Sequence, residues 1–144
     1  MKNYIIPFFI ATTLFGSCKK NTNHPATSMS VYIGGDSVWT TSVVTLDNTG
    51  GTIYISGINT KTSEKVNLSL YNYREGRKTY IITNSIGGVN TGGGRGQYES
   101  ATTLVEASTG SVSITDYTTN PIIGLYDFSS NSGHVSGAFI APKP

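Results

Sequence analysis

Cysteine and histidine are both scarce in this chain of 144 residues, which has one cysteine and two histidines. A single cysteine excludes an internal disulfide and any cysteine-rich zinc site. His134 has no carboxylate or second histidine two or four residues away, the spacings at which two ligands share one metal ion. The sequence therefore predicts no bound metal and implies no cofactor.

Catalytic residue types are equally sparse. His134 and Asp127 with a neighbouring serine would supply the side chains of a hydrolase triad, but no strained nucleophile turn accompanies them. We therefore expect no catalytic residue and no enzyme activity.

Charged residues make up only 12% of the chain, and the formal net charge of +2 comes without any block of like charge. So weak a long-range field does not indicate a nucleic-acid partner. Threonine, serine, glycine, asparagine and tyrosine are abundant instead. Threonine and tyrosine, with the valines and isoleucines, fit the surface of a pleated sheet and favour a β-structure.

No apolar run is long enough for a membrane-spanning helix, which needs roughly 20 residues. The longest run covers residues 4–15 and is interrupted by Pro7. It follows Lys2 and precedes the small residues Gly16 and Ser17, the order found in a secretion signal. We expect residues 1–17 to be a signal peptide that is removed.

The segment Leu14-Phe15-Gly16-Ser17-Cys18 resembles the lipobox of bacterial lipoproteins. The resemblance implies that Cys18 becomes the first residue and carries diacylglycerol on its thiol and an acyl chain such as palmitate on its amino group. Several hydrocarbon chains hold a protein stably at a membrane, whereas one chain binds only marginally. The alternative is an ordinary signal-peptide remnant with a free or buried cysteine. Residues 18–28 lack hydrophobic periodicity and are predicted to form a flexible tether.

Residues 29–144 show apolar and polar residues in alternation and no apolar residues at helical spacing. In "EKVNLSLY", for example, Val66, Leu68 and Leu70 alternate with Asn67 and Ser69. Nine short strands are expected, at 29–33, 38–46, 52–58, 64–71, 78–83, 97–106, 111–117, 121–128 and 134–140. Glycine turns between most of them favour antiparallel neighbours. The predicted fold is a single all-β domain, an antiparallel sandwich or half-open barrel of eight or nine strands.

Several stretches resemble the small outer-membrane lipoproteins of the Bacteroidetes that have β-domains of unknown function. These are "VYIGGDSVWTTS", "GRKTYIIT", "TGSVSITDY" and "IIGLYDFSSNSGHVSGAFIA". The resemblance spans residues 29–141 and implies a compact β-domain with a lipid anchor, without a known activity. The segment after Cys18 lacks the acidic residues that resemble surface-export signals in these bacteria, so the periplasmic face of the outer membrane is expected.

The glycine-rich segment "GGVNTGGGRGQ" at residues 87–97 does not end in the Gly-Lys-Ser/Thr sequence of a phosphate-binding loop. We expect residues 84–98 to form a surface loop, which is either a plain linker or a partner contact made through Asn90, Arg95 and Tyr98. Ser37, within the tripeptide Asp-Ser-Val, resembles an acceptor for O-glycosylation in a predicted turn.

Five aromatic residues are candidates for a sugar-stacking surface. They are Trp39, Tyr71, Tyr73, Tyr98 and Tyr117. Trp39 alternates with polar residues in a way that favours the core, whereas Tyr71 and Tyr117 fall on the polar side of their strands.

Together these features predict a lipid-anchored envelope domain with a non-catalytic binding or assembly role, whose partner is an envelope protein or a glycan. Two alternatives stay open: a lipocalin-like carrier of a small apolar ligand, with a lined cavity in place of a solid core, and a glycan-binding accessory lipoprotein.

Overall fold

The computed structural model describes residues 26–83, 92–116, 118 and 120–143. Within these residues the chain is all-β and contains no helix, as the sequence predicted. In chain order the strands are β1 (Ser28–Ile33), β2 (Asp36–Thr41), β3 (Val44–Thr49), β4 (Thr52–Ile58), β5 (Lys65–Leu70), β6 (Thr79–Thr83), β7 (Gly94–Glu99), β8 (Leu104–Glu106), β9 (Thr109–Asp116), β10 (Ile122–Ser130) and β11 (Gly133–Ala141).

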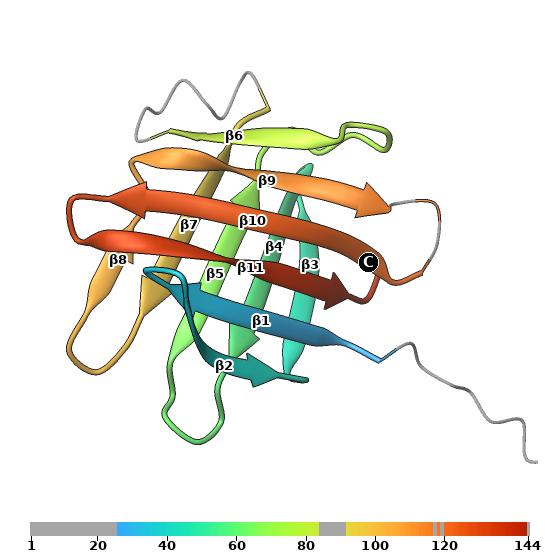
Figure 1. The fold of residues 1–144 in the computed structure, drawn as a ribbon. Coiled ribbons are helices and arrows are strands. Elements are labelled where there is room, and N and C mark those ends of the chain that lie inside the picture. The colour runs from blue at the N-terminus through green and yellow to red at the C-terminus, as the bar shows by residue number, and fades with distance from the viewer. Residues whose placement is uncertain (1–25, 84–91, 117, 119, 144) are drawn as a thin grey trace, which may run out of the picture.

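All eleven strands belong to one continuous sheet in the order β2-β1-β11-β10-β9-β6-β7-β5-β4-β3, with β8 beside β7. The sheet folds back on itself between β6 and β7. Its first layer holds β2, β1, β11, β10, β9 and β6, and its second layer holds β7, β5, β4, β3 and β8 (Figure 1). The strands of the two layers cross each other, which gives a nearly closed, barrel-like sheet.

The two layers also meet where β2 passes into β3. The Thr41 hydroxyl donates to the Ile58 carbonyl at 2.7 Å, and the Ile58 amide donates to the Val43 carbonyl at 3.1 Å. These bonds join the corner of the chain to the end of β4 without forming a ladder between β2 and β3. The sheet is therefore a half-open barrel, one of the two architectures that the sequence predicted.

Strand pairing differs from the prediction at one place. Most neighbours are antiparallel, but β6 and β7 run parallel, with Ile82 opposite Gly94. Parallel neighbours need a longer connection than a hairpin turn, and ten residues separate the end of β6 from the start of β7.

The strand count is eleven because two of the nine expected strands are each divided by a corner. The strand expected at 38–46 is interrupted at Ser42 and Val43, where the Thr41 hydroxyl accepts the Val43 amide. The strand expected at 97–106 is interrupted by the turn at residues 100–103, where the Ser100 hydroxyl accepts the Thr103 amide at 3.0 Å. Serine and threonine hydroxyls that bond to a nearby backbone compete in this way with strand ladders.

The core between the layers is formed by the inward residues of nearly every strand. The alternation read from β5 is confirmed, since Leu68 is 1% exposed. Trp39 is 8% exposed and belongs to the core, as predicted. The largest fully buried side chains are Tyr80, Phe128, Phe139, Met29, Ile53, Ile55, Leu68, Leu70, Ile82, Ile122, Val31 and Val66.

Two glycines allow the layers to approach closely. A Cβ atom added to Gly96 of β7 would lie 2.6 Å from Cδ1 of Phe128 in β10, and one added to Gly57 of β4 would collide with Met29 of β1. At distances this short, a side chain at either position would require its neighbour to shift. The interior is filled by side chains at these two points.

The position of Gly96 corrects the prediction that residues 84–98 form a loop. Gly94–Glu99 is β7, which pairs with β5, β6 and β8. Glycine has a low strand propensity, and it is present at position 96 because the Phe128 ring occupies the space of a side chain. Residues 94–98 of the expected loop are thus part of a strand, and residues 84–91 lie outside the described residues.

We predict that Gly96→Ala lowers the free energy of unfolding by about 1–3 kcal/mol, because the added methyl group overlaps the Phe128 ring. Phe128→Leu frees part of this space. The double variant should therefore lose less stability than the sum of the two single variants, as measured by denaturant unfolding. Strict additivity would show that the two residues do not compete for the same space.

Candidate functional site

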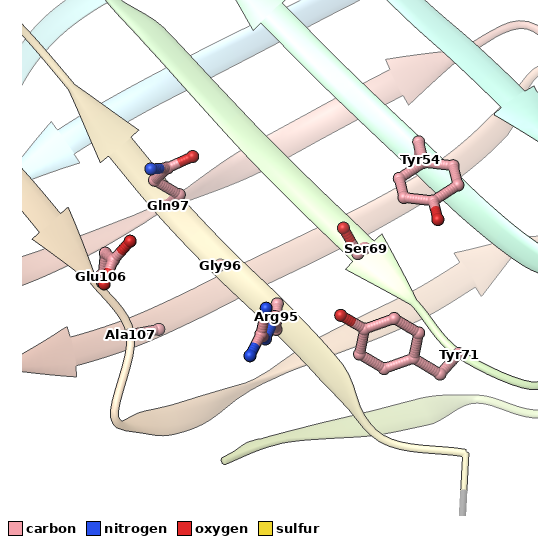
Figure 2. A pocket seen from close by; sticks show the side chains of 8 residues that line it. All are labelled: Tyr54, Ser69, Tyr71, Arg95, Gly96, Gln97, Glu106 and Ala107. Carbon is pink, nitrogen blue, oxygen red and sulfur yellow. The ribbon is translucent and has the colours of Figure 1, made fainter. Parts of the chain in front are cut away.

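A groove lies on the outer face of the second layer, across β4, β5, β7 and β8. Its volume is about 500 Å³, within the range of small-ligand sites. Figure 2 shows its lining residues: Tyr54, Ser69, Tyr71, Arg95, Gly96, Gln97, Glu106 and Ala107. We call this site the β5–β7 groove.

Strand alternation and register bring these side chains together. Tyr54 on β4 is opposite Ser69 on β5, and Ser69 is opposite Arg95 on β7, so the three form one row across the sheet. In the next row, Gln97 on β7 is opposite Glu106 on β8. Outward residues of neighbouring strands must share a face, so the groove follows directly from the pairing of four strands.

The aromatic residues of the groove are Tyr54 and Tyr71. Tyr54 stands on the strand next to Ser69, and the Tyr71 ring extends from the end of β5 toward Arg95 (Figure 2). The Tyr54 side chain is 46% exposed. A ring face that is open to solvent in this way is available for stacking.

The polar groups of the groove have no hydrogen-bond or ion-pair partner among the described residues. This applies to the side chains of Arg95, Gln97 and Glu106 and to the hydroxyls of Tyr54 and Tyr71. On the same face outside the groove, by contrast, the Ser56 hydroxyl donates to the Asn67 side-chain oxygen at 2.8 Å. The groove therefore presents unused donors and acceptors to solvent.

Of the residues that the sequence assigned to a partner contact, the structure places only Arg95 in the groove. Tyr98 is 3% exposed, and its hydroxyl donates to Oε1 of Glu64 at 2.8 Å. Its position on the inward side of β7 removes it from any surface contact, because residues 94, 96 and 98 face the core. Asn90 lies outside the described residues.

The Tyr98–Glu64 contact is a closed hydrogen-bond network. Burial, together with the hydrogen bond to Glu64, raises the pKa of Tyr98 to about 12. The pKa of Glu64 is lowered, above all by the hydrogen bond from the Thr62 hydroxyl at 2.6 Å. Asn59 donates to the same carboxylate at 3.3 Å. These groups are satisfied within the protein and are not a ligand site.

The other predicted positions are spread over the molecule. Ser37 is exposed and is the second residue of β2, after the turn at Gly34 and Gly35; its modification stays a prediction. Cys18 lies outside the described residues, so lipidation also stays a prediction.

Of the aromatic candidates, Tyr71 alone lines the groove. Tyr73 packs against the core and stacks on Tyr80, with ring centroids 6.1 Å apart. Trp39 and Tyr98 are buried, and Tyr117 lies outside the described residues.

Sequence reasoning missed Tyr54, Ser69, Gln97 and Glu106 as site residues. Tyr54 carried a usable signal, because it alternates with the buried Ile53 and Ile55 in "TIYIS" and therefore had to face outward. The others are ordinary outward residues whose grouping depends on which strands are neighbours.

His134 and Asp127 do form a pair, with 2.9 Å between Nε2 and Oδ2. Both side chains are exposed, at 42% and 63%, and an ion pair so exposed contributes little to stability. The pair lies on β10 and β11 in the first layer, away from the groove residues of the second.

The described residues contain no cluster of three or more His, Cys, Asp or Glu side chains that could hold a metal ion. The described part of the chain likewise has no helix that is long and apolar enough to cross a membrane.

Comparison of the chain with protein-family models, with curated proteins and with solved structures finds no match.

Proposed function

We propose that the chain is a lipid-anchored protein of the outer membrane whose β-domain binds a ligand of the cell envelope without transforming it. The observation that carries the binding role is the β5–β7 groove, which combines two tyrosines with charged and amide side chains that have no partner among the described residues. The lipobox-like segment ending at Cys18 supports the anchor.

Two features support binding at the surface over transport of an apolar ligand in the interior. The layers are in close contact at Gly96 and Phe128 and at Gly57 and Met29. The groove, in addition, is lined mainly by polar groups, whereas an apolar ligand needs an apolar lining. The anchor and the missing acidic residues after Cys18 favour the periplasmic face of the membrane.

The test uses the full-length protein extracted in detergent and mixed with fractionated envelope polysaccharides and envelope peptides. At least one fraction should raise the melting temperature, because a ligand that binds only the folded state stabilises it. Mass spectrometry should recover the bound material unchanged. Cleavage or other modification of that material, or the absence of stabilisation by every fraction, would contradict the proposal.

A further inference from the structure

The backbone under the β5–β7 groove limits the kind of ligand that can bind. β5 is hydrogen-bonded to β4 and β7 along the groove, and β7 is hydrogen-bonded to β8 from Gln97 to Glu99. The backbone groups of β5 are thus used within the sheet on both sides, and an extended peptide cannot add beside it as a further strand. Over β5, recognition proceeds through the side chains of the outer face.

These side chains suit a polyhydroxylated ligand. Ser69, Gln97 and the tyrosine hydroxyls can each donate and accept hydrogen bonds, and Glu106 can accept them. A sugar hydroxyl also donates and accepts hydrogen bonds, so each hydroxyl of the ligand can find a hydrogen-bond partner in the groove. No aliphatic side chain larger than that of Ala107 lines the site, which leaves the two tyrosine rings as its apolar surfaces. Rings of this kind pack against the C–H face of a sugar.

The charged residues of the groove further restrict the chemical class of the ligand. Arg95 is the one cationic side chain among the lining residues, and Glu106 is the one anionic side chain. A guanidinium without a protein partner matches a carboxylate through two parallel hydrogen bonds. Glu106, on the neighbouring strand, disfavours a ligand with many closely spaced negative charges. A second negative group of such a ligand would be repelled by the Glu106 carboxylate.

We propose that the β5–β7 groove binds an acidic oligosaccharide, one that carries a carboxylate on some of its sugars and hydroxyls on the rest. Arg95 pairs with the carboxylate, and Tyr54 and Tyr71 contact sugar rings. Gln97, Ser69 and Glu106 bond to hydroxyls. This inference rests on the proposed binding function and specifies its ligand class.

The test measures binding of the full-length protein in detergent to a panel of uronic-acid-containing tetrasaccharides by titration calorimetry. Each tetrasaccharide is compared with its carboxyl-reduced form, which has the same sugars and linkages but a hydroxymethyl group in place of the carboxylate. The acidic form of at least one tetrasaccharide should bind about tenfold to a hundredfold more tightly, the range expected for a charge-assisted hydrogen bond.

Three variants test whether the groove is responsible for the preference for the carboxylate form. Arg95→Gln should bring the two affinities within about twofold of each other, chiefly because binding of the acidic form is weakened. Tyr54→Ala should weaken both forms to a similar extent, because the ring contacts the sugar and not its charge. Lys61→Gln removes an exposed cation on the turn between β4 and β5, outside the groove, and should change neither affinity.

The proposal is overturned if no acidic tetrasaccharide binds, if Arg95→Gln keeps the carboxyl preference, or if an acidic peptide of equal charge binds more tightly. An envelope fraction that stabilises the protein by another chemistry would leave the binding function standing and refute only the acidic-saccharide assignment. Stabilisation by no fraction at all would refute both.

Discussion

Leu68→Asp is expected to unfold the domain, whereas Ser69→Asp, one residue further along β5, is expected to leave the melting temperature nearly unchanged. Leu68 is 1% exposed and lies between Ile55 of β4 and Gly96 of β7. Removal of a buried leucine side chain costs about 2–5 kcal/mol, and an unpaired carboxylate in its place adds a further desolvation cost. The sum is comparable with the whole stability of a domain, about 5–15 kcal/mol.

Ser69 is the matched control, because it is a neighbour in the same strand and faces the groove. A carboxylate at this position is solvated and stands opposite Arg95 in the register, so it should be tolerated. Thermal unfolding followed by circular dichroism checks both variants. Similar melting temperatures for the two would show that the two faces of β5 have been assigned the wrong way round.

Cys18→Ala is expected to abolish attachment to the membrane. Without the thiol there is no site for diacylglycerol, the precursor is not processed, and the several acyl chains that stable anchoring needs are never added. Metabolic labelling with an alkynyl fatty acid should tag the native protein and leave the variant untagged.

Ser17→Ala keeps a small residue before the cysteine and should still be labelled, which makes it the control for this experiment. A native protein that takes up no label would contradict the lipidation proposal. A Cys18→Ala variant that takes up label would show that the acyl chains are attached to another residue.

Most of the fold could be predicted because alternating apolar residues report directly which face of a strand is buried. Val66, Leu68 and Leu70 are inward, as their alternation with Asn67 and Ser69 predicted. The corners at residues 42–43 and 100–103 were not predicted. Threonine and serine occur both inside the strands and at the bends of this chain, and their hydroxyl bonds to the backbone become visible only in three dimensions.

β7 was misplaced for a different reason. Glycine-rich sequence is typical of loops, yet Gly94 and Gly96 belong to a central strand. What selects glycine at position 96 is the Phe128 ring of the opposite layer, 32 positions further along the chain. Local sequence carries no trace of such a contact.

The candidate site was predictable only in fragments. Arg95 was singled out from the sequence, but as part of a loop. Its association with Tyr54 and Glu106 depends on the strand order β8-β7-β5-β4 and on the register of each pair. Alternation predicts that each residue faces outward and cannot predict which other strands lie beside it.

The covalent state of the mature amino terminus tests the lipid anchor most directly, and mass spectrometry of the protein extracted from native membranes can determine it. We expect the first residue to be Cys18, with a mass increased by a thioether-linked diacylglycerol and an amide-linked acyl chain. A chain that begins at another residue, or a Cys18 with an unmodified thiol, would contradict the assignment of this protein as a lipid-anchored binding domain of the envelope.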